Sequence, residues 1–368
     1  MTKDTSIFFY HGCNWTDIPA RQQYLMAQMA KFTPVVYFDG GADNPLTVTV
    51  HEPRHNITVV RGLTAVCQRL HQRGLGKLAS LYTWWHLRNI RRRYGKIIFW
   101  CAENWLRPYR WIRHDALVYD CIDPCFSEEP KRVEIFQNRD RLAMADAACV
   151  FATADELADF CRRHHRNVLL LNNACEAADY EKQLLDAAPV PDWWPKTGKP
   201  IAAYLGSLDW RFDFPAVEKA CRDQPELHFV LAGNILPHLQ ESVAELAKLA
   251  NVTAPGRISL SDGRYLLSRC AIGLIPFTVG KMNDAINPVK MYAYALLGKP
   301  MAGTAVRELL ARPDIVSTPR NGADFSSAVT VALAASRLRE TAEKLKSFAA
   351  ANTWEARAAQ AWEAIQRL

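Results

Sequence analysis

Short apolar runs alternate with amphipathic stretches along the whole chain. In the first half we predict strands at 6–10, 34–38, 47–50, 57–60, 97–101, 116–119, 148–152 and 168–171. In the second half we predict strands at 201–205, 228–231, 252–254, 271–275, 300–303 and 315–318. Helical patterns lie between them, for example at 19–31, 133–145 and 215–223. Short, continuously apolar strands separated by helices are typical of parallel sheets covered on both faces. The pattern therefore predicts an α/β fold with two doubly wound, Rossmann-like domains.

Two domains also suit the length, because 368 residues exceed the roughly 100 to 200 of a typical domain. The alternation stops at 187–200, which has four prolines and no period, so we predict a linker there. We expect one domain at 1–186 and a second at 201–350. The remaining segment, 351–368, is predicted to be a helix that returns to the first domain.

Composition favours a cytoplasmic protein. Hydrophobic residues make up 49% of the chain, enough for two cores, but no run approaches the roughly 18 to 20 apolar residues that span a bilayer. The first ten residues lack the long apolar region of a signal peptide. The ten cysteines show no zinc-ligand spacing, and we expect reduced thiols.

The net charge of +7 is unevenly distributed. Residues 54–113 contain thirteen Lys or Arg and one acidic residue, a balance of +12, which leaves about −5 for the rest of the chain. The same segment holds five tryptophans. Basic residues interleaved with tryptophan suit an anionic membrane surface. We predict peripheral association of 54–113 with the inner face of the cytoplasmic membrane and no nucleic-acid partner. Single-stranded nucleic acid, bound by stacking and charge, is the rival interpretation, and a solvated basic face is the plainest one.

A candidate anion site lies at 287–300, which reads N-P-V-K-M-Y-A-Y-A-L-L-G-K-P. Asn287 suits the N-cap of a helix about three turns long, Pro288 its first position, and Gly298 the left-handed residue just past its end. The free amide hydrogens and the dipole of the first turn suit a phosphate, and Lys290 adds a full positive charge. The alternative is an ordinary buried helix with Lys290 solvated at its edge.

Loops after the other strands of the second domain supply further candidates, because ligands of parallel sheets bind beyond the carboxyl ends of the strands. Gly206 and Ser207 follow the first strand, where a glycine lets the backbone approach a phosphate, and Arg211 offers a fork for phosphate oxygens. Gly233 follows the second strand and could admit a base or ribose. Phe277 ends a further strand. A glycine after a strand more often simply forms a turn, so each loop alone is weak evidence for a binding site.

These segments, in this order, resemble the donor-binding domain of GT-B glycosyltransferases. The likeness extends to family 4-like enzymes of the teichuronic-acid type, which build surface polysaccharides, and more distantly to the xanthan glucuronosyltransferase. It is carried by Y-L-G-S-L-D-W-R-F-D at 204–213, F-V-L-A-G at 229–233, A-I-G-L-I-P-F at 271–277, the segment 287–300, Y-D-C-I-D at 119–123, V-L-L-L-N-N-A at 168–174 and, more loosely, P-A-R-Q-Q at 19–23.

The resemblance implies two domains facing across a cleft and transfer of a sugar from a nucleoside-diphosphate donor, of UDP, GDP or TDP type, to an acceptor hydroxyl. Acceptors in polysaccharide assembly are often lipid-linked glycans. No cofactor is implied besides the donor. Lys290, Arg211 and the helix amides would neutralise the leaving diphosphate without a metal. No Asp-x-Asp motif stands at a strand end, so we predict no metal site.

Relatives usually carry Glu or Gln three residues after the lysine, where this chain has Ala293. Donor binding would then depend on other residues, such as Asn287 or Glu308. Tyr292 is a further predicted donor contact. Alternatively, the chain is a catalytically silent nucleotide-sugar-binding subunit that scaffolds a partner transferase.

An inverting reaction also needs a proton acceptor in the first domain. Asp120 and Asp123 end a predicted strand and are our candidates, with turn capping or a salt link as their alternative role. His11, directly after the first strand, is a further candidate for a substrate contact.

Overall fold

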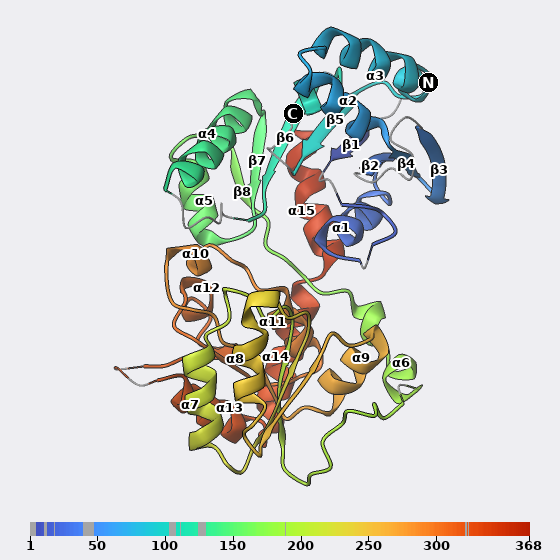
Figure 1. Cartoon of the computed structure of the whole chain (residues 1–368). Coiled ribbons are helices and arrows are strands. Elements are labelled where there is room, and N and C mark those ends of the chain that lie inside the picture. Colours follow the sequence, from blue (N-terminus) through green and yellow to red (C-terminus); the bar gives the residue numbers. More distant parts are fainter. Residues whose placement is uncertain are drawn as a thin grey trace. The chain divides into compact units, whose positions relative to one another are not determined.

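The computed structural model describes residues 5–10, 13–17, 19–39, 48–102, 108–110, 112–123, 130–187, 189–320, 322 and 324–368 (Figure 1). The chain forms two compact units. The first comprises Met1–Asn172 together with Trp354–Leu368, and the second comprises Asn173–Thr353. The nine cysteines among the described residues are free thiols.

The first unit is built on one eight-stranded sheet. Its strands are β1 (Ser6–Tyr10), β2 (Val35–Asp39), β3 (Thr49–Arg54), β4 (Ile57–Arg61), β5 (Ile97–Cys101), β6 (Ala116–Cys121), β7 (Cys149–Ala152) and β8 (Val168–Leu170). They are ordered β3-β4-β2-β1-β5-β6-β7-β8, and only the β3/β4 pair is antiparallel. Its helices are α1 (Arg21–Met29), α2 (Leu63–Gln72), α3 (Gly76–Arg91), α4 (Pro130–Asp146), α5 (Asp155–Arg162) and α15 (Trp354–Gln366), with a 3-10 turn at Pro108–Arg110.

The second unit contains a six-stranded, fully parallel sheet. Its strands are β9 (Ile201–Leu205), β10 (His228–Ala232), β11 (Val252–Gly256), β12 (Ile272–Ile275), β13 (Met301–Gly303) and β14 (Val316–Ser317). Its helices are α6 (Lys182–Ala187), α7 (Phe214–Asp223), α8 (Gln240–Leu246), α9 (Leu260–Arg269), α10 (Lys281–Asp284), α11 (Val289–Leu296), α12 (Arg307–Leu310), α13 (Phe325–Ala335) and α14 (Arg339–Ala351), with 3-10 turns at Ala177–Tyr180 and Pro237–Leu239.

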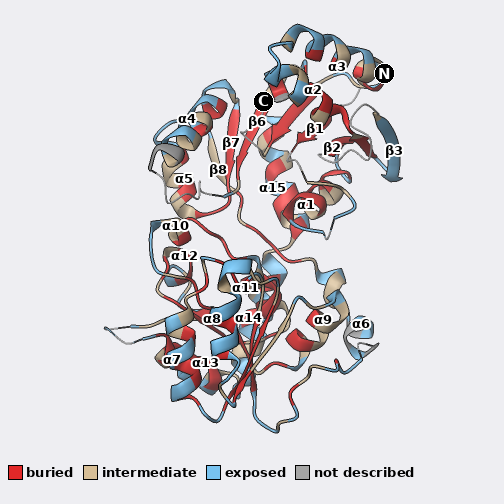
Figure 2. Cartoon of the chain, in the orientation of Figure 1, coloured by how far each residue is buried: buried red, intermediate tan, exposed pale blue. Residues whose placement is uncertain are grey.

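The strand order is β11-β10-β9-β12-β13-β14, which is 3-2-1-4-5-6 when the strands are counted along this unit. That is the order of a Rossmann-type sheet. Most of the apolar runs form strands that are buried in Figure 2, because both faces of these sheets are covered, whereas the edge strand β3 is exposed along its whole length. The predicted α/β class with two doubly wound sheets is confirmed.

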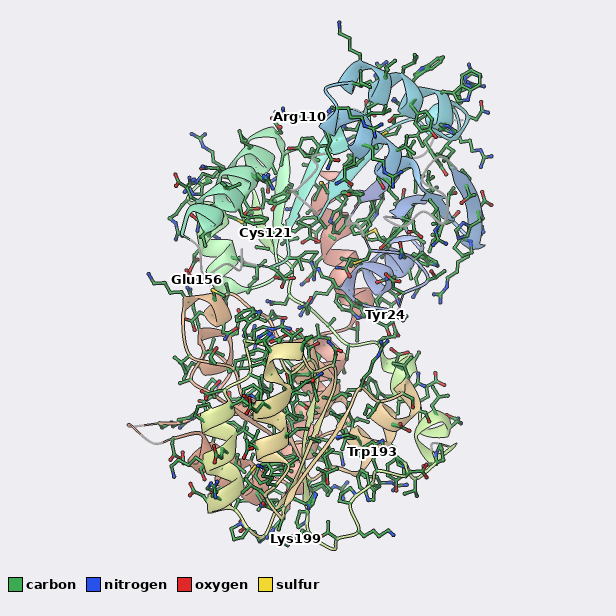
Figure 3. All side chains as sticks on the ribbon, viewed as in Figure 1. Tyr24, Arg110, Cys121, Glu156, Trp193 and Lys199 are labelled. Atoms are coloured by element: carbon green, nitrogen blue, oxygen red, sulfur yellow. The ribbon has the colours of Figure 1, made fainter. Side chains whose placement is uncertain are left out.

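The boundary between the units lies at Asn172 and Asn173, and not in the proline-rich segment 187–200. That segment belongs to the second unit. Trp193, labelled in Figure 3, donates its indole N–H to the Asp262 carboxylate of α9 over 3.4 Å, and the rings of Trp194 and Tyr265 meet at 4.9 Å. The prolines interrupt the periodicity without detaching the segment, because its tryptophans anchor it to α9.

The last helix, α15, packs against α1 within the first unit. The rings of Tyr24 and Trp354 stack at 6.2 Å, and those of Phe32 and Trp362 do the same. The Arg21 guanidinium lies 5.9 Å from the Trp354 ring centroid. Aromatic contacts of this kind tie the end of the chain to its first helix.

Candidate functional site

The strand order of the second unit reverses between β9 and β12, which are neighbours in the sheet but not in the sequence. Ligands of open α/β sheets bind beyond the carboxyl ends of the strands at such a point. Gly206 follows β9 directly, and Phe277 lies two residues beyond β12. The topology therefore places the candidate site around these two loops.

The loops after β9 and β10 meet through two glycines. A Cβ atom on Gly233 would lie 1.8 Å from the Gly206 carbonyl oxygen, so only glycine fits there. A Cβ atom on Gly206 would lie 2.8 Å from the Lys290 Nζ. Gly233 thus owes its place to backbone packing against the neighbouring loop, and its contact with a base or ribose stays a prediction. Gly206 instead leaves room for the lysine.

Lys290 of α11 is the centre of this region. Its Nζ lies 3.8 Å from the ring centroid of Tyr204 and 5.3 Å from that of Phe277. Within the described parts of the chain, no carboxylate or carbonyl group binds this ammonium. The pKa of Lys290 is lowered to about 7, chiefly by burial and also by the charge of Arg211, against the opposing effect of Asp209. A cation held on aromatic faces without an anionic partner is suited to an anionic ligand.

Arg211 has a partner already. Its Nε donates to both oxygens of Asp209, at 2.9 and 3.1 Å, and its Nη2 completes the fork on the same carboxylate. Burial raises the pKa of Asp209, but the hydrogen bonds from Arg211 outweigh that effect and the pKa is lowered. The guanidinium fork that we predicted for phosphate oxygens is thus bound to Asp209, and its contact with a donor stays a prediction.

Two residues of this cluster were missed in the sequence. Tyr204 supplies the ring beneath Lys290, and its hydroxyl donates to the Ser207 carbonyl over 2.6 Å. Asp209 fixes Arg211. The signal for Asp209 was its spacing of two residues from Arg211 in one loop. Ser207 enters the site through its main-chain carbonyl.

The helix α11 begins at Val289, so Pro288 is its N-cap, and it spans eight residues instead of about three turns. The predicted N-cap, Asn287, is engaged elsewhere. Its Oδ1 accepts from the Asn173 backbone N–H and from the Tyr292 hydroxyl, both at 2.9 Å. No side chain caps the helix, which leaves amide hydrogens of its first turn available. Gly298, with φ of 65°, ends it as predicted.

The Asn287 amide also donates to Glu308 over 2.7 Å, and Arg312 contacts the same carboxylate at 2.9 Å. Glu308 is fully buried, and Asn287 and Tyr292 are nearly so. Buried residues of this kind cannot line an open donor site. The structure therefore corrects our assignment of Asn287, Tyr292 and Glu308 as donor contacts: they form a network that holds the start of α11.

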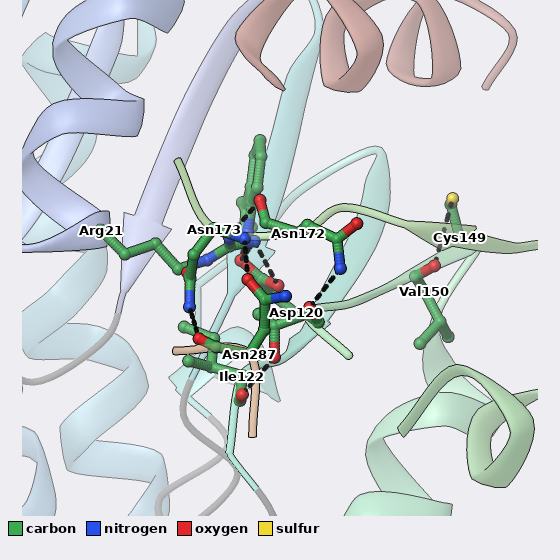
Figure 4. A network of polar contacts seen from close by, with 10 residues as sticks. Arg21, Asp120, Ile122, Cys149, Val150, Asn172, Asn173 and Asn287 are labelled. Carbon is green, nitrogen blue, oxygen red and sulfur yellow. Dashed lines mark hydrogen bonds and ion pairs between the residues drawn. The ribbon is translucent and has the colours of Figure 1, made fainter. Parts of the chain in front are cut away.

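In the first unit, Asp120 forms a buried ion pair with Arg21 (Figure 4). The Arg21 Nη2 lies 3.2 Å from Oδ1, and the Trp100 indole donates to Oδ2 over 3.1 Å. A carboxylate that is 1% exposed and bound through both oxygens is not placed to accept a substrate proton. Asp123, two residues beyond β6, is exposed. His11 lies outside the described residues.

No protein family model matches the chain. Over 104 residues, 28% of the chain, it is 25% identical to TuaH of Bacillus subtilis, provisionally named a teichuronic acid biosynthesis glycosyltransferase. The match spans 26% of the length of TuaH.

Solved structures resemble the chain along nearly its whole length. Sucrose-phosphate synthase from Thermosynechococcus elongatus has a TM-score of 0.76 at 15% identity, covering 99% of both chains. A UDP-forming trehalose-phosphate synthase from Burkholderia vietnamiensis has a TM-score of 0.68 at 12% identity, covering 100% of this chain and 99% of that one. Anabaena HepE in complex with UDP and glucose has a TM-score of 0.64 at 14% identity, covering 99% of this chain and all of HepE.

The fold is GT-B. At identities this low, the GT-B likeness establishes how the chain folds, and the chemistry must be argued from its own residues. Among the described residues, no three His, Cys, Asp or Glu gather as a metal site would need. No helix in the same part of the chain has both the length and the apolar character that crossing a bilayer requires.

Proposed function

We propose that this protein is a glycosyltransferase whose second unit binds a nucleoside-diphosphate sugar beyond β9 and β12. One observation carries the proposal. The Lys290 ammonium rests on the rings of Tyr204 and Phe277 beside the uncapped start of α11, without an anionic partner in the described structure. A diphosphate supplies the missing negative charge.

The chemistry follows from where negative charge develops. As the bond between the sugar and the diphosphate breaks, charge accumulates on the departing phosphate oxygens. Lys290 and the first amide hydrogens of α11 are in place before that happens, so their stabilisation of the leaving group costs little reorganisation. The Asp209–Arg211 pair adds little net charge but fixes the loop after β9. This arrangement needs no metal ion to neutralise the diphosphate.

The identities of the donor and the acceptor are proposed from the comparisons with known proteins. The solved HepE structure contains UDP and glucose, which favours a UDP sugar as the donor. The name of TuaH favours a glycan of a surface polysaccharide as the acceptor, which we propose is lipid-linked. The basic segment 54–113 supports a location on the inner face of the cytoplasmic membrane. Asp123 remains our candidate proton acceptor in the first unit.

The test compares the wild type with Lys290→Met, using Lys281→Met, an exposed lysine of the same unit, as the matched control. Thermal stabilisation is measured with UDP, GDP, TDP and CMP, and sugar release with the corresponding sugar donors. We expect the wild type and Lys281→Met to be stabilised by one nucleoside diphosphate and to release its sugar, and Lys290→Met to do neither.

Two results would contradict the proposal. Equal stabilisation of Lys290→Met and the wild type would place the diphosphate elsewhere. Nucleotide binding by the wild type without sugar release, even with glycolipid acceptors present, would favour the silent scaffold subunit. Ala293, which stands where the resemblance to GT-B glycosyltransferases implies Glu or Gln, is the feature that favours this second candidate.

A further inference from the structure

The solvent face of α3 is unusually apolar for a surface helix. Ala79, Thr83, Leu87 and Ile90 form its buried face. At 100° per residue, the opposite face carries four large apolar side chains that are 51 to 59% exposed, namely Leu78, Leu81, Trp84 and Trp85. Figure 2 shows the exposed side of this helix at one end of the first unit. A helix in contact with water normally presents polar residues there, so this stripe indicates a binding surface.

The same face continues into a hollow lined by arginines. A cavity of about 280 Å³ is bordered by Trp84, Arg88, Arg91, Arg92, Ile112 and Arg113. The Arg88 guanidinium lies 3.5 Å from the ring centroid of Trp85, which couples the cationic cavity to the apolar stripe. Arginines gathered in one cavity repel one another, so the cavity favours the binding of an anion.

Three of the four arginines of this cavity have no carboxylate partner in the described structure. Among the described residues, Arg88, Arg91 and Arg113 form no ion pair. Burial lowers the pKa of Arg91, and the charge of Arg113 lowers it further, while Asp115 acts in the opposite direction. Asp115 itself accepts the Ile97 backbone N–H over 2.8 Å. The cavity therefore keeps a positive balance and geometry suited to phosphate oxygens.

We propose that α3 is an interfacial helix for anionic bilayers. Its leucine and tryptophan stripe enters the boundary between headgroups and acyl chains, and the arginine cavity at its C-terminal end holds the phosphate of an anionic lipid headgroup. The cavity lies beside the stripe and shares Trp84 with it, while Thr83 and Leu87 of the buried face line its inner side. Insertion and phosphate binding can therefore occur together.

A bilayer explains this surface better than the other partners that could bind it. Bases stack on aromatic rings and phosphates pair with arginine, but Leu78 and Leu81 offer a nucleic acid neither contact. A second copy of this chain would bring two strongly basic segments together, since 54–113 carries +12. Only a lipid surface presents hydrocarbon and phosphate at adjacent depths.

This inference deepens the membrane part of the proposed function, and it involves no residue of the donor site. Co-sedimentation is measured with vesicles of phosphatidylcholine alone and with vesicles containing about one third phosphatidylglycerol. We expect the wild type to bind the anionic vesicles at least about tenfold more tightly.

Two double variants separate the two features of α3. Leu81→Ser with Trp85→Ser should abolish binding to both kinds of vesicle. Arg91→Gln with Arg113→Gln should weaken binding to the anionic vesicles about thirtyfold, since each lost cation near the surface removes roughly a fivefold gain. Both variants should keep the wild-type urea midpoint and bind the nucleotide as the wild type does.

Two control variants test whether weaker vesicle binding results merely from a lost charge or a lost apolar side chain elsewhere on the surface. Arg54→Gln with Arg69→Gln removes two exposed charges from the same basic segment outside the cavity and should weaken binding only a few fold. Leu338→Ser removes a leucine of the second unit that is as exposed as Leu81, at 59%, and should have no effect. Equal losses in the cavity variant and its charge control would overturn the phosphate site.

Three other outcomes would overturn the proposal. They are equal binding to both kinds of vesicle, binding of inorganic phosphate without binding to vesicles, and steeply salt-dependent binding to oligonucleotides in the absence of vesicle binding. Vesicle binding needs no donor, so Lys290→Met should bind vesicles normally. If the donor-site proposal failed, the membrane proposal would therefore still stand. If the membrane proposal failed, the donor-site proposal would be unaffected.

Discussion

The Arg21–Asp120 pair of the first unit and Lys290 of the second show two ways in which this protein buries charge. Asp120 is 1% exposed and is bound by Arg21 and Trp100. Lys290 is half-buried against two aromatic rings, and no carboxylate in the described structure forms an ion pair with it. A buried charge that has its ionic and hydrogen-bonding partners is compatible with a stable fold. A buried charge that lacks a counter-charge is energetically unfavourable until a ligand supplies one. We propose that the number of partners distinguishes a structural charge, such as Asp120, from one that binds a ligand, such as Lys290.

The largest effect should come from breaking the matched pair. Asp120→Asn leaves Arg21 buried without its counter-charge, and we expect it to lower the free energy of unfolding by about 3 to 5 kcal/mol. Urea denaturation measures this. Arg110→Gln breaks an exposed pair, in which the atoms are 3.7 Å apart, and should cost about 0 to 1 kcal/mol. If Asp120→Asn were as stable as the wild type but no longer transferred sugar, Asp120 would be an active-site residue and this prediction would be contradicted.

Glu308 offers a second matched charge in the unit that carries Lys290. Glu308→Gln weakens the contacts to Asn287 and Arg312 and should destabilise the protein by about 1 to 3 kcal/mol. Because the network positions the start of α11, nucleotide affinity should fall only moderately. Calorimetric unfolding and nucleotide titration of the same sample test both statements. A complete loss of affinity at unchanged stability would show that Glu308 contacts the donor directly.

Replacing the unmatched charge should have the opposite sign. The pKa of Lys290 is lower in the folded protein than its usual value of 10.5, so the unfolded chain binds the proton more tightly and the charge disfavours folding. Lys290→Met should raise the ligand-free stability by about 1 kcal/mol. The gain is greatest at or below about pH 7 and vanishes above the usual lysine pKa. A destabilised Lys290→Met variant would contradict the comparison.

A further effect should appear in the pH dependence of nucleotide affinity. In the ligand-free protein Lys290 loses its proton as the pH rises through about 7. A bound diphosphate favours the ammonium and raises that pKa, so binding takes up a proton. Affinity should therefore fall between pH 7 and 9, by up to about tenfold per unit. The fall should be absent in Lys290→Met, and a fall retained in that variant would assign it to another group.

The sequence predicted more of the fold than of the site. The apolar runs located the strands of the two sheets in the described structure, since most of these runs are short, continuous and buried; the exposed edge strand β3 is the exception. Gly298 was also found, because a left-handed residue after a helix has a local signature.

The site depends instead on distant or hidden partners. Asn287 looked like a helix cap, but it binds Asn173, 114 positions away. Asp120 looked like a base, but it pairs with Arg21, 99 positions away. Nothing local in the sequence encodes such separations. Lys290 was singled out because its charge, the helix start and the preceding strand lie within one segment, and its role in donor binding stays a prediction.

The most direct test is a crystal structure with bound UDP. The account predicts that the diphosphate lies beyond β9 and β12, with a phosphate oxygen in direct contact with the Lys290 Nζ, at about 2.7 to 2.9 Å, and with the first amides of α11. A diphosphate bound far from Lys290, with the ammonium still resting on Tyr204 and Phe277 alone, would contradict it.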